Sequence, residues 1–300
     1  MPQLSVIMPV LNAEQFLHES MSSTMRTLPR DAELRLLDDG STDSTLRILE
    51  DWASKDARIR LHRHETPQGV HVSLNELAQA GDSEVIGRMD ADDICLPGRW
   101  TRGLRATRTA DMAFSTVLRI NEQGWPIGAD QPGPLSAQAV PWHLLLGCAV
   151  VHGTVTMRRK HFETLGGYEN TGAEDYELWL RSASRGGRIV RSAVPTVAYR
   201  SHSHQTTHRR PWENDETPVL EESYTALAEK LLGPGDKDER RRQLSAVTHR
   251  GPISPNTRAA VARLLDEVHE ESQNLPVLDR VLLEWRIRRE RFRLAHRPVD

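Results

Sequence analysis

The chain has 300 residues and a mass of 33.9 kDa, which leaves room for one large domain or for a domain with an appendage. Lysine and arginine number 39 against 42 acidic residues, so the net charge of −3 removes a global electrostatic case for binding nucleic acid. The two cysteines, Cys95 and Cys148, exclude a disulfide framework and favour a reducing cytoplasm. The sequence shows neither a signal-peptide pattern nor an apolar run of the ~20 residues that cross a bilayer.

The first hundred residues alternate between short apolar runs and amphipathic helical patterns. Periodicity and turn chemistry predict strands over residues 4–10, 33–37, 58–62 and 85–89, with helices between them around residues 16–28, 46–53 and 70–78. This alternation implies a mainly parallel central sheet with right-handed crossovers and flanking helices. The predicted fold class is therefore α/β and Rossmann-like.

The regularity loosens after residue 100. The patterns predict a strand over 112–120 with a hairpin turn at 121–125, a helix over 137–146, a strand over 151–157, a helix over 174–184 and a strand over 194–199. Residues 201–216, which include His202 and His204, suit an ordered loop or lid over a site. Helices follow over 218–231, 238–248, 256–273 and 276–296, so we expect a C-terminal α-helical appendage.

Carboxylates gather where two of the predicted parallel strands end, which is the edge where open α/β sheets bind ligands. Asp38 and Asp39 end the second strand, and Asp90, Asp92 and Asp93 end the fourth. Three carboxylates within four residues suit a hard divalent cation, which takes oxygen ligands and keeps substrate phosphates as further ligands. Turn and helix-cap chemistry is the alternative, chiefly for the first pair. Glycine-rich phosphate loops are absent, so a phosphate site must rely on metal and basic side chains.

Seven segments follow one another in an order that resembles a known family. They are SVIMPVLNAEQFL, LLDDGSTDST, the region around Asn75, GRMDADDICLPGRW, HGTVTMRRKHFETLGGY, AEDYELWLR and YRSHSHQTT. Over about residues 3–207 the set resembles the family-2 glycosyltransferases of GT-A fold. The resemblance implies a catalytic domain over 1–210, with nucleotide-sugar binding in about 1–100 and the acceptor side and catalytic base in about 101–210, and it leaves 211–300 as a helical extension.

The resemblance also implies roles on the donor side. The positions that match the family's nucleotide-sugar pocket are Pro9, Val10, Asn12, Glu14, Asp39, Asn75, Arg88, Asp90 and Arg200. Asp39 matches the acid that hydrogen-bonds the base, usually uracil, and Asp90 would contact ribose or the donor sugar. Asp92 of the DXD motif would coordinate Mn²⁺ or Mg²⁺ on the donor diphosphate, and His202 is the second candidate for the metal.

On the acceptor side the resemblance assigns a base and two contact residues. Asp175, in the pair Glu174-Asp175, matches the catalytic base. Inverting transfer needs one carboxylate that accepts the proton of the attacking hydroxyl, and a place in the first turn of a helix favours the ionised form by about 0.3–1 kcal/mol. A simple capping acid is the alternative. His152 would contact sugar hydroxyls, or else be a core histidine, and Trp179 is assigned to the acceptor side although its spacing also makes it a candidate for burial.

The sequence thus predicts a metal-dependent, inverting glycosyltransferase. It would move a sugar from a nucleotide-diphosphate donor, with UDP preferred, to a hydroxyl of a glycan or lipid-linked acceptor in bacterial polysaccharide or glycoconjugate synthesis. The alternatives are a sugar nucleotidylyltransferase, whose glycine-rich loop is missing here, and a non-catalytic nucleotide-sugar-binding module. Residues 281–297 carry six arginines against two glutamates, which suits contact with the inner face of an anionic membrane, homo-oligomerisation, or simple packing of an apolar face.

Overall fold

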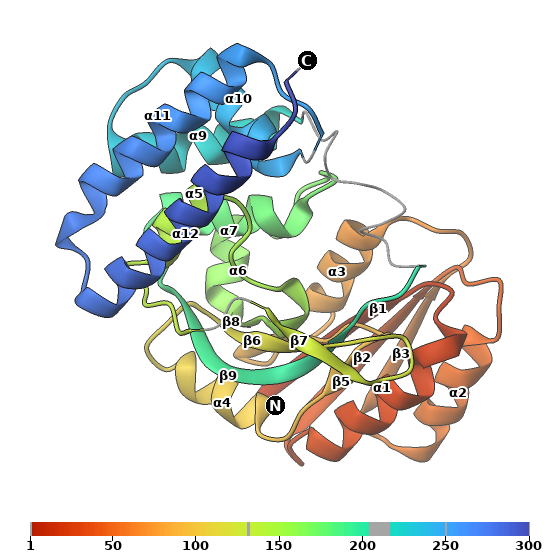
Figure 1. Ribbon diagram of the computed structural model, residues 1–300. Coiled ribbons are helices and arrows are strands. Elements are labelled where there is room, and N and C mark those ends of the chain that lie inside the picture. The colour runs from red at the N-terminus through yellow and green to blue at the C-terminus, as the bar shows by residue number, and fades with distance from the viewer. Residues whose placement is uncertain (1, 131–132, 204–216, 250, 300) are drawn as a thin grey trace. The chain divides into compact units, whose positions relative to one another are not determined.

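The computed structural model describes residues 2–130, 133–203, 217–249 and 251–299 (Figure 1). Contacts divide the chain into two compact units that interleave along the sequence. The sheet unit comprises residues 1–134, 150–170 and 190–203, and the helical unit comprises 135–149, 171–189 and 204–300. Two segments from within the expected catalytic domain thus pack with the C-terminal helices, and the expected functional boundary at residue 210 stays a prediction. Of the expected lid, residues 204–216, with His204, lie outside the described residues.

One mixed sheet organises the sheet unit. Its elements are β1 (Leu4–Val10), α1 (Glu14–Thr27), β2 (Ala32–Asp39), α2 (Thr45–Lys55), β3 (Ile59–His64), α3 (Val70–Gln79), β4 (Val85–Arg88), β5 (Ile94–Cys95), α4 (Arg99–Ala106), β6 (Met112–Ile120), β7 (Pro126–Asp130), the 3-10 helix η1 (His152–Thr154), β8 (Thr156–Arg158), α6 (Arg159–Leu165) and β9 (Ile189–Arg200). The strand order is β3-β2-β1-β4-β8-β6-β9-β5, with β7 paired to β6. The first four strands pair in parallel, as predicted, whereas the pairs β4–β8, β6–β8, β6–β7 and β5–β9 are antiparallel.

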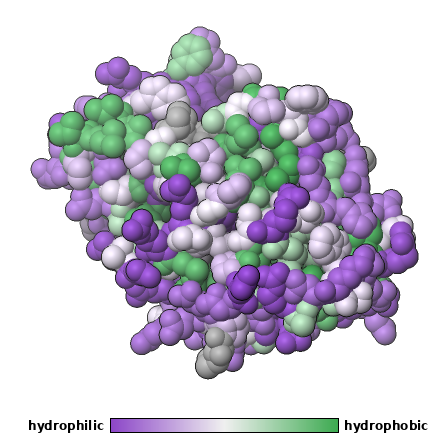
Figure 2. Space-filling view, turned by 90° about the horizontal axis from the view of Figure 1, so that it is seen from below, coloured by the Kyte–Doolittle hydropathy of each residue, from purple (hydrophilic) through white to green (hydrophobic). Residues whose placement is uncertain are grey.

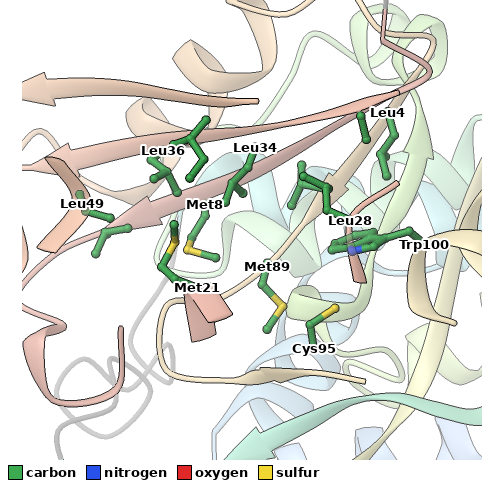
Figure 3. Packing of buried hydrophobic residues seen from close by; sticks show 14 of the residues in the cluster. Leu4, Met8, Met21, Leu28, Leu34, Leu36, Leu49, Met89, Cys95 and Trp100 are labelled. Carbon is green, nitrogen blue, oxygen red and sulfur yellow. The ribbon is translucent and has the colours of Figure 1, made fainter. Parts of the chain in front are cut away.

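Side-chain alternation in the parallel strands builds a core on each face of the sheet. Met8 and Leu36 belong to a buried cluster with Met21 of α1, Leu49 of α2 and Trp100 of α4 (Figure 3). Successive residues of a strand point to opposite faces, so the odd-numbered residues of β1 and β2 face the side that α3 covers. Burial of each large apolar side chain contributes about 1.5–3 kcal/mol, which fixes the strands and leaves their carboxyl ends and the loops that follow them free to build a site.

The helical unit is built from six α-helices in its described residues. They are α5 (Val140–Leu145), α7 (Glu174–Ser184), α9 (Pro218–Leu232), α10 (Lys237–Thr248), α11 (Pro255–Glu271) and α12 (Val277–His296), with the 3-10 helix η3 (Ser272–Asn274) before the last. Side chains of Asp236 and Ser254 cap the first turns of α10 and α11. The buried Tyr176 of α7 and Tyr224 of α9 donate hydrogen bonds to backbone carbonyls of α5, at 2.6 and 3.2 Å, which tie these three helices together.

Most predicted elements form, and the exceptions have local causes. The strand expected over 151–157 is instead η1 followed by β8, because the bonds Thr154 N–Val151 O and Val155 N–His152 O close a tight helical turn. Periodicity missed the short elements β5, α4 and α6. None of the helices in the described ranges is long and apolar enough to cross a membrane. The face drawn in Figure 2 is mainly hydrophilic, with smaller hydrophobic patches between polar residues.

Candidate active site

The loop after β1 is locked to the loop after β2 by side chains predicted to line the nucleotide pocket. Asn12 has a φ of +48°, a left-handed conformation that asparagine tolerates better than most residues. Its side-chain oxygen accepts the Thr42 N–H at 2.8 Å, and its own N–H donates to Ser41 Oγ at 2.9 Å. Glu14, at the start of α1, accepts the N–H of Ser44 at 2.8 Å. These bonds fix the two loops at the carboxyl ends of β1 and β2.

The two predicted residues before this loop belong to β1 itself. Pro9 and Val10 lie opposite Leu37 and Asp38 of β2. Pairing with β4 on the other side ends at Ile7, so the proline, which lacks an N–H, stands beyond the last parallel pair of that ladder. Val10 is buried in the core of the sheet unit. The pair therefore sets where the strand ends and the loop begins.

Asp39, the last residue of β2, is a buried carboxylate held by three donors. Its Oδ1 accepts the N–H of Gln68 at 2.8 Å and lies 2.6 Å from Nδ1 of His64, and its Oδ2 accepts the N–H of Gly69 at 3.0 Å. His64 contacts Glu76 through its other ring nitrogen, at 2.9 Å. The result is an acceptor-only group with a defined orientation at the sheet edge.

Asn75 of α3 binds the backbone of the segment that follows α6. Its side-chain nitrogen donates to the carbonyl of Tyr168 at 2.8 Å, and its oxygen accepts the Tyr168 N–H at 2.9 Å. The Tyr168 hydroxyl in turn lies 2.9 Å from Nε2 of His152, which is buried in η1. Asn75 and His152 therefore both form hydrogen bonds with Tyr168. Their predicted contacts with nucleotide and acceptor stay predictions.

The DXD segment after β4 is densely bonded. Arg88 Nε lies 2.9 Å from Asp90 Oδ1, and the Asp90 backbone carbonyl accepts the hydroxyl of Ser20 at 2.8 Å. Asp93 is buried and accepts the Arg200 N–H at 2.8 Å. Burial, reinforced by the neighbouring charges of Asp92 and Asp90, holds the pKa of Asp93 well above its usual range. Asp93 therefore serves the structure of the loop, while Asp90 and Asp92 keep partly exposed carboxylates.

Arg200 ties three segments together from the end of β9. Its guanidinium donates to the backbone carbonyls of Asp92 and Glu122, each at 2.9 Å, and forms an ion pair with Glu19 of α1. It also stacks over the ring of Phe16, with Cζ 4.7 Å from the ring centroid. Arg200 is only 2% exposed. These contacts fix the DXD loop and the turn between β6 and β7, and the predicted contact with the donor stays a prediction.

Asp92 and His202 meet at the same sheet edge. Oδ2 of Asp92 lies 3.0 Å from Nε2 of His202, whose ring also packs on Phe16 with centroids 4.9 Å apart. Two donor atoms at this separation match neighbouring ligands of an ion whose bonds are ~2.0–2.1 Å long, as for Mg²⁺. Within the described residues, no group of three or more His, Cys, Asp or Glu side chains is placed so that it could hold a metal ion by itself. The pair fits a site in which diphosphate and water would complete the coordination.

The predicted base lies in the helical unit. Glu174 and Asp175 are the first two residues of α7, and Oδ1 of Asp175 accepts the N–H of Tyr176 at 2.7 Å. Both carboxylates are partly exposed, and the helix N-terminus favours their ionised form. Trp179, one turn on, has no exposed surface and packs in the core. Its predicted place on the acceptor side stays a prediction.

Sequence reasoning missed the residues that hold the predicted ones in place. They are Glu19, His64, Glu76, Glu122 and Tyr168. Glu76 and Tyr168 lie within quoted segments, but no spacing assigns a role to any of the five, because each acts through a partner that is distant in sequence. The one available signal was the register of β2 and β3, which sets His64 opposite Asp39 when both strand ends are aligned.

Comparison with known proteins agrees with this architecture. A sequence model described as Glycosyl transferase family 2 matches residues 5–166. The putative glycosyltransferase EpsE of Bacillus subtilis is 32% identical over 195 residues, which cover 62% of this chain and 69% of that protein. Chondroitin synthase of Escherichia coli is 23% identical over 192 residues, which cover 62% of this chain and 27% of that protein. The structure of S. aureus TarS residues 1–349 in complex with UDP-GlcNAc is similar with a TM-score of 0.62 and 15% identity, covering 98% and 89% of the two chains.

These findings define the class of the protein as a glycosyltransferase of GT-A fold, with a mixed sheet flanked by helices and further helices at the C-terminus. The chain belongs to glycosyl transferase family 2.

Proposed function

We propose that this glycosyltransferase is a metal-dependent, inverting enzyme that transfers a sugar from a UDP-sugar to a hydroxyl of a glycan or lipid-linked acceptor. The observation that carries the proposal is the pair Asp92–His202, 3.0 Å apart, at the sheet edge where Asp39 also ends its strand. The similarity to chondroitin synthase supports a role in polysaccharide synthesis, and the UDP-GlcNAc in the TarS complex supports a UDP donor.

The donor would bind along the carboxyl ends of the parallel strands. The Asp39 carboxylate only accepts hydrogen bonds, which suits the imide N–H of uracil. Asp90 has a partly exposed carboxylate for the ribose or the donor sugar. Asp92 and His202 would hold Mn²⁺ or Mg²⁺, which when bound stabilises the charge of the departing diphosphate.

Asp175 would accept the proton of the acceptor hydroxyl as its oxygen attacks the anomeric carbon. One carboxylate suffices for this step, and proton transfer of this kind contributes about 10²–10⁴-fold in rate. Its place in the first turn of α7 favours the ionised form of the carboxylate.

We assign no step of this chemistry to the C-terminal helices α9 to α12. α12 exposes a row of apolar side chains on one face, which are Leu278, Val281, Trp285 and Phe292. This row is the candidate surface for both predicted alternatives, an anionic membrane surface and a second copy of the chain. We place the reaction in the cytoplasm, where nucleotide sugars are made available.

Two substitutions test the assignment of metal and base. Asp92→Asn should weaken Mn²⁺-dependent binding of UDP by about tenfold or more, because the substitution removes the charged carboxylate that would bind the metal. Asp175→Asn should leave UDP binding within about twofold of wild type and lower sugar transfer by about 10²–10⁴-fold. Calorimetry measures the binding, and UDP release from a panel of UDP-sugars measures the transfer.

The exposed Asp51→Asn on α2 is the matched control, because it removes one carboxylate away from the sheet edge. Circular dichroism confirms that each variant is folded. Full transfer by a folded Asp175→Asn enzyme would refute the assigned base, and Mn²⁺-dependent UDP binding by Asp92→Asn equal to that of wild type would refute the metal site.

A further inference from the structure

We infer that His64 is a positioning residue for the nucleotide base. It is clamped between Asp39 and Glu76, and it holds the Asp39 carboxylate so that one acceptor position of that carboxylate faces the ligand. The inference rests on the proposed function, because it takes Asp39 as the group that forms a hydrogen bond with the nucleotide base.

The clamp joins two neighbouring strands and one helix. His64 is the last residue of β3 and lies in register with Asp39, the last residue of β2. Nδ1 of His64 lies 2.6 Å from Asp39 Oδ1, and Nε2 lies 2.9 Å from Oε2 of Glu76 on α3. The His64 and Asp39 side chains are 14% and 6% exposed, so water competes little for their contact.

Counting acceptor positions shows what the clamp leaves for a ligand. Each carboxylate oxygen offers about two lone pairs. Among the residues that the structure describes, Oδ1 of Asp39 has two partners, His64 and the N–H of Gln68, whereas Oδ2 has one, the N–H of Gly69. One position on Oδ2 therefore stays available for a donor such as the uracil imide. Without His64 the carboxylate would have a second free position and could rotate.

The protonation of His64 sets the strength of the clamp. Only the imidazolium donates from both ring nitrogens, so only this form bonds both carboxylates. Burial by itself lowers the pKa of His64, but the hydrogen bonds and charges of Asp39 and Glu76 outweigh burial and raise the pKa above its usual value. The clamp therefore stays complete up to a higher pH than the usual pKa of histidine would allow.

Other charged groups on the adjoining elements do not share this contact. Within the described part of the chain, His64 forms no hydrogen bond with the nearby titratable or charged side chains of its own strand end and of α3, which are His62, Arg63, Glu65 and His71. The charged side chains of α2 belong to a helix that covers the opposite face of the sheet, where Leu49 packs on Leu36 in the buried cluster. Asp39 and Glu76 are the charges that govern His64.

The direction of the pH effect follows from these charges. As pH rises through the raised pKa of His64, the ring loses a proton and a bare nitrogen then faces a carboxylate. Affinity for the base should therefore fall as pH rises. The stability that the clamp contributes to the fold changes in the same sense: it is fully present below the unfolded pKa of about 6.5 and is lost as pH rises through the folded pKa.

Uridine is the probe for the test, because it has neither phosphate nor metal and reports the base and ribose contacts alone. NMR titration of the full-length protein between pH 6 and 9 measures its affinity. We expect His64→Gln to weaken uridine binding by about fivefold to tenfold at pH 6, as for the net loss of one hydrogen bond, and to flatten the pH dependence. Glu76→Gln should shift the fall in affinity to lower pH. His62→Gln, an exposed neighbour, is the control and should change neither.

Hydrogen exchange at the amides of Gln68 and Gly69 separates this inference from the proposed function. Both amides bond Asp39, so His64→Gln should speed their exchange whether or not a nucleotide binds. Unchanged exchange and unchanged uridine affinity in this variant would overturn the inference. If wild type binds neither uridine nor UDP but the exchange still depends on His64, the proposed function fails and the positioning of Asp39 stands.

Discussion

Several polar side chains near the sheet edge form hydrogen bonds and ion pairs with other parts of the protein. Asn75 uses both ends of its amide on the backbone of Tyr168, and Arg200 divides its guanidinium among Asp92, Glu122 and Glu19. Such residues fix loops that lack regular hydrogen bonds of their own. A motif residue therefore need not touch the ligand for its loss to affect ligand binding.

The two hydrogen bonds between Asn75 and the backbone of Tyr168 give a direct test of this point. Replacing Asn75 with alanine leaves the Tyr168 N–H and carbonyl without their partner, so the free energy of unfolding should fall by about 1–3 kcal/mol. Urea denaturation measures the change. Gln79→Ala, an exposed position on the same helix, is the control and should stay within about 0.5 kcal/mol. Equal stability of Asn75→Ala and wild type would show that the two bonds contribute nothing net.

At the scale of elements, the close approach of β4 and α4 depends on one glycine. A Cβ atom on Gly87 would lie 2.7 Å from Cζ3 of Trp100, whose side chain is 1% exposed in the core. Only a residue without a side chain lets the indole pack directly on the strand. The helix that follows the DXD loop is thereby anchored to the sheet.

This contact predicts a coupled pair of substitutions. Gly87→Ala should lower the free energy of unfolding by about 1–3 kcal/mol through overpacking. Trp100→Phe removes the ring atoms nearest to the new methyl group, so the double variant should be more stable than the sum of the two single changes predicts. Thermal or urea unfolding of the four proteins completes the cycle, and strict additivity would contradict the proposed contact.

Elements with strong local signals were predictable, and those built by distant contacts were not. α7 begins at Glu174 because acidic residues fill its first turn, and the predicted bounds of residues 174–184 are those observed. β5 has two residues and exists through its pairing with β9, which no local pattern reports. The predicted strand over 194–199 starts earlier, at Ile189, because pairing within the sheet extends it past Pro195.

The same division holds at the candidate site. Motif spacing singles out Asp39 and Asp92, since each lies at or just after a strand end in a pattern that the local sequence displays. The contact of Asp39 with His64 requires the register of two strands, and the contact of Asp92 with His202 joins residues 110 positions apart. Such contacts depend on the order and register of the strands in the sheet, and the periodicity of the sequence does not predict these.

At the scale of the molecule, most arginines of the basic C-terminal segment, residues 281–297, bond other groups of the helical unit. Arg286 donates to the carbonyls of Leu146 and Gly147, and Arg291 pairs with Asp266 at 2.6 Å. Arg289 and Arg293 both pair with the carboxylate of a single glutamate. Most of the positive charge that the sequence displays is therefore used within the helical unit, which weakens the electrostatic part of the membrane alternative.

The buried arginine and an exposed one on the same helix make a matched pair for measurement. Arg286→Met leaves two carbonyls at the end of α5 unpaired and should lower the free energy of unfolding by about 1–3 kcal/mol. Arg288→Met, at an exposed position, should stay within about 0.5 kcal/mol of wild type. Denaturant titration distinguishes them. Equal losses would indicate that charge, rather than the bonds to α5, is what α12 contributes.

The interleaving of the two units has a consequence for synthesis. α5 and α7 emerge from the ribosome well before α9 and α12, the helices against which they pack. Roughly 110 residues separate the ends of α7 and α12, which take roughly 5–20 s to translate at ~5–20 residues per second. Early in that interval β9 completes the sheet unit, while α5 and α7 still lack the helices against which they pack. The nascent enzyme therefore passes through a stage in which two of the six helices of its helical unit expose apolar faces before the other four are made.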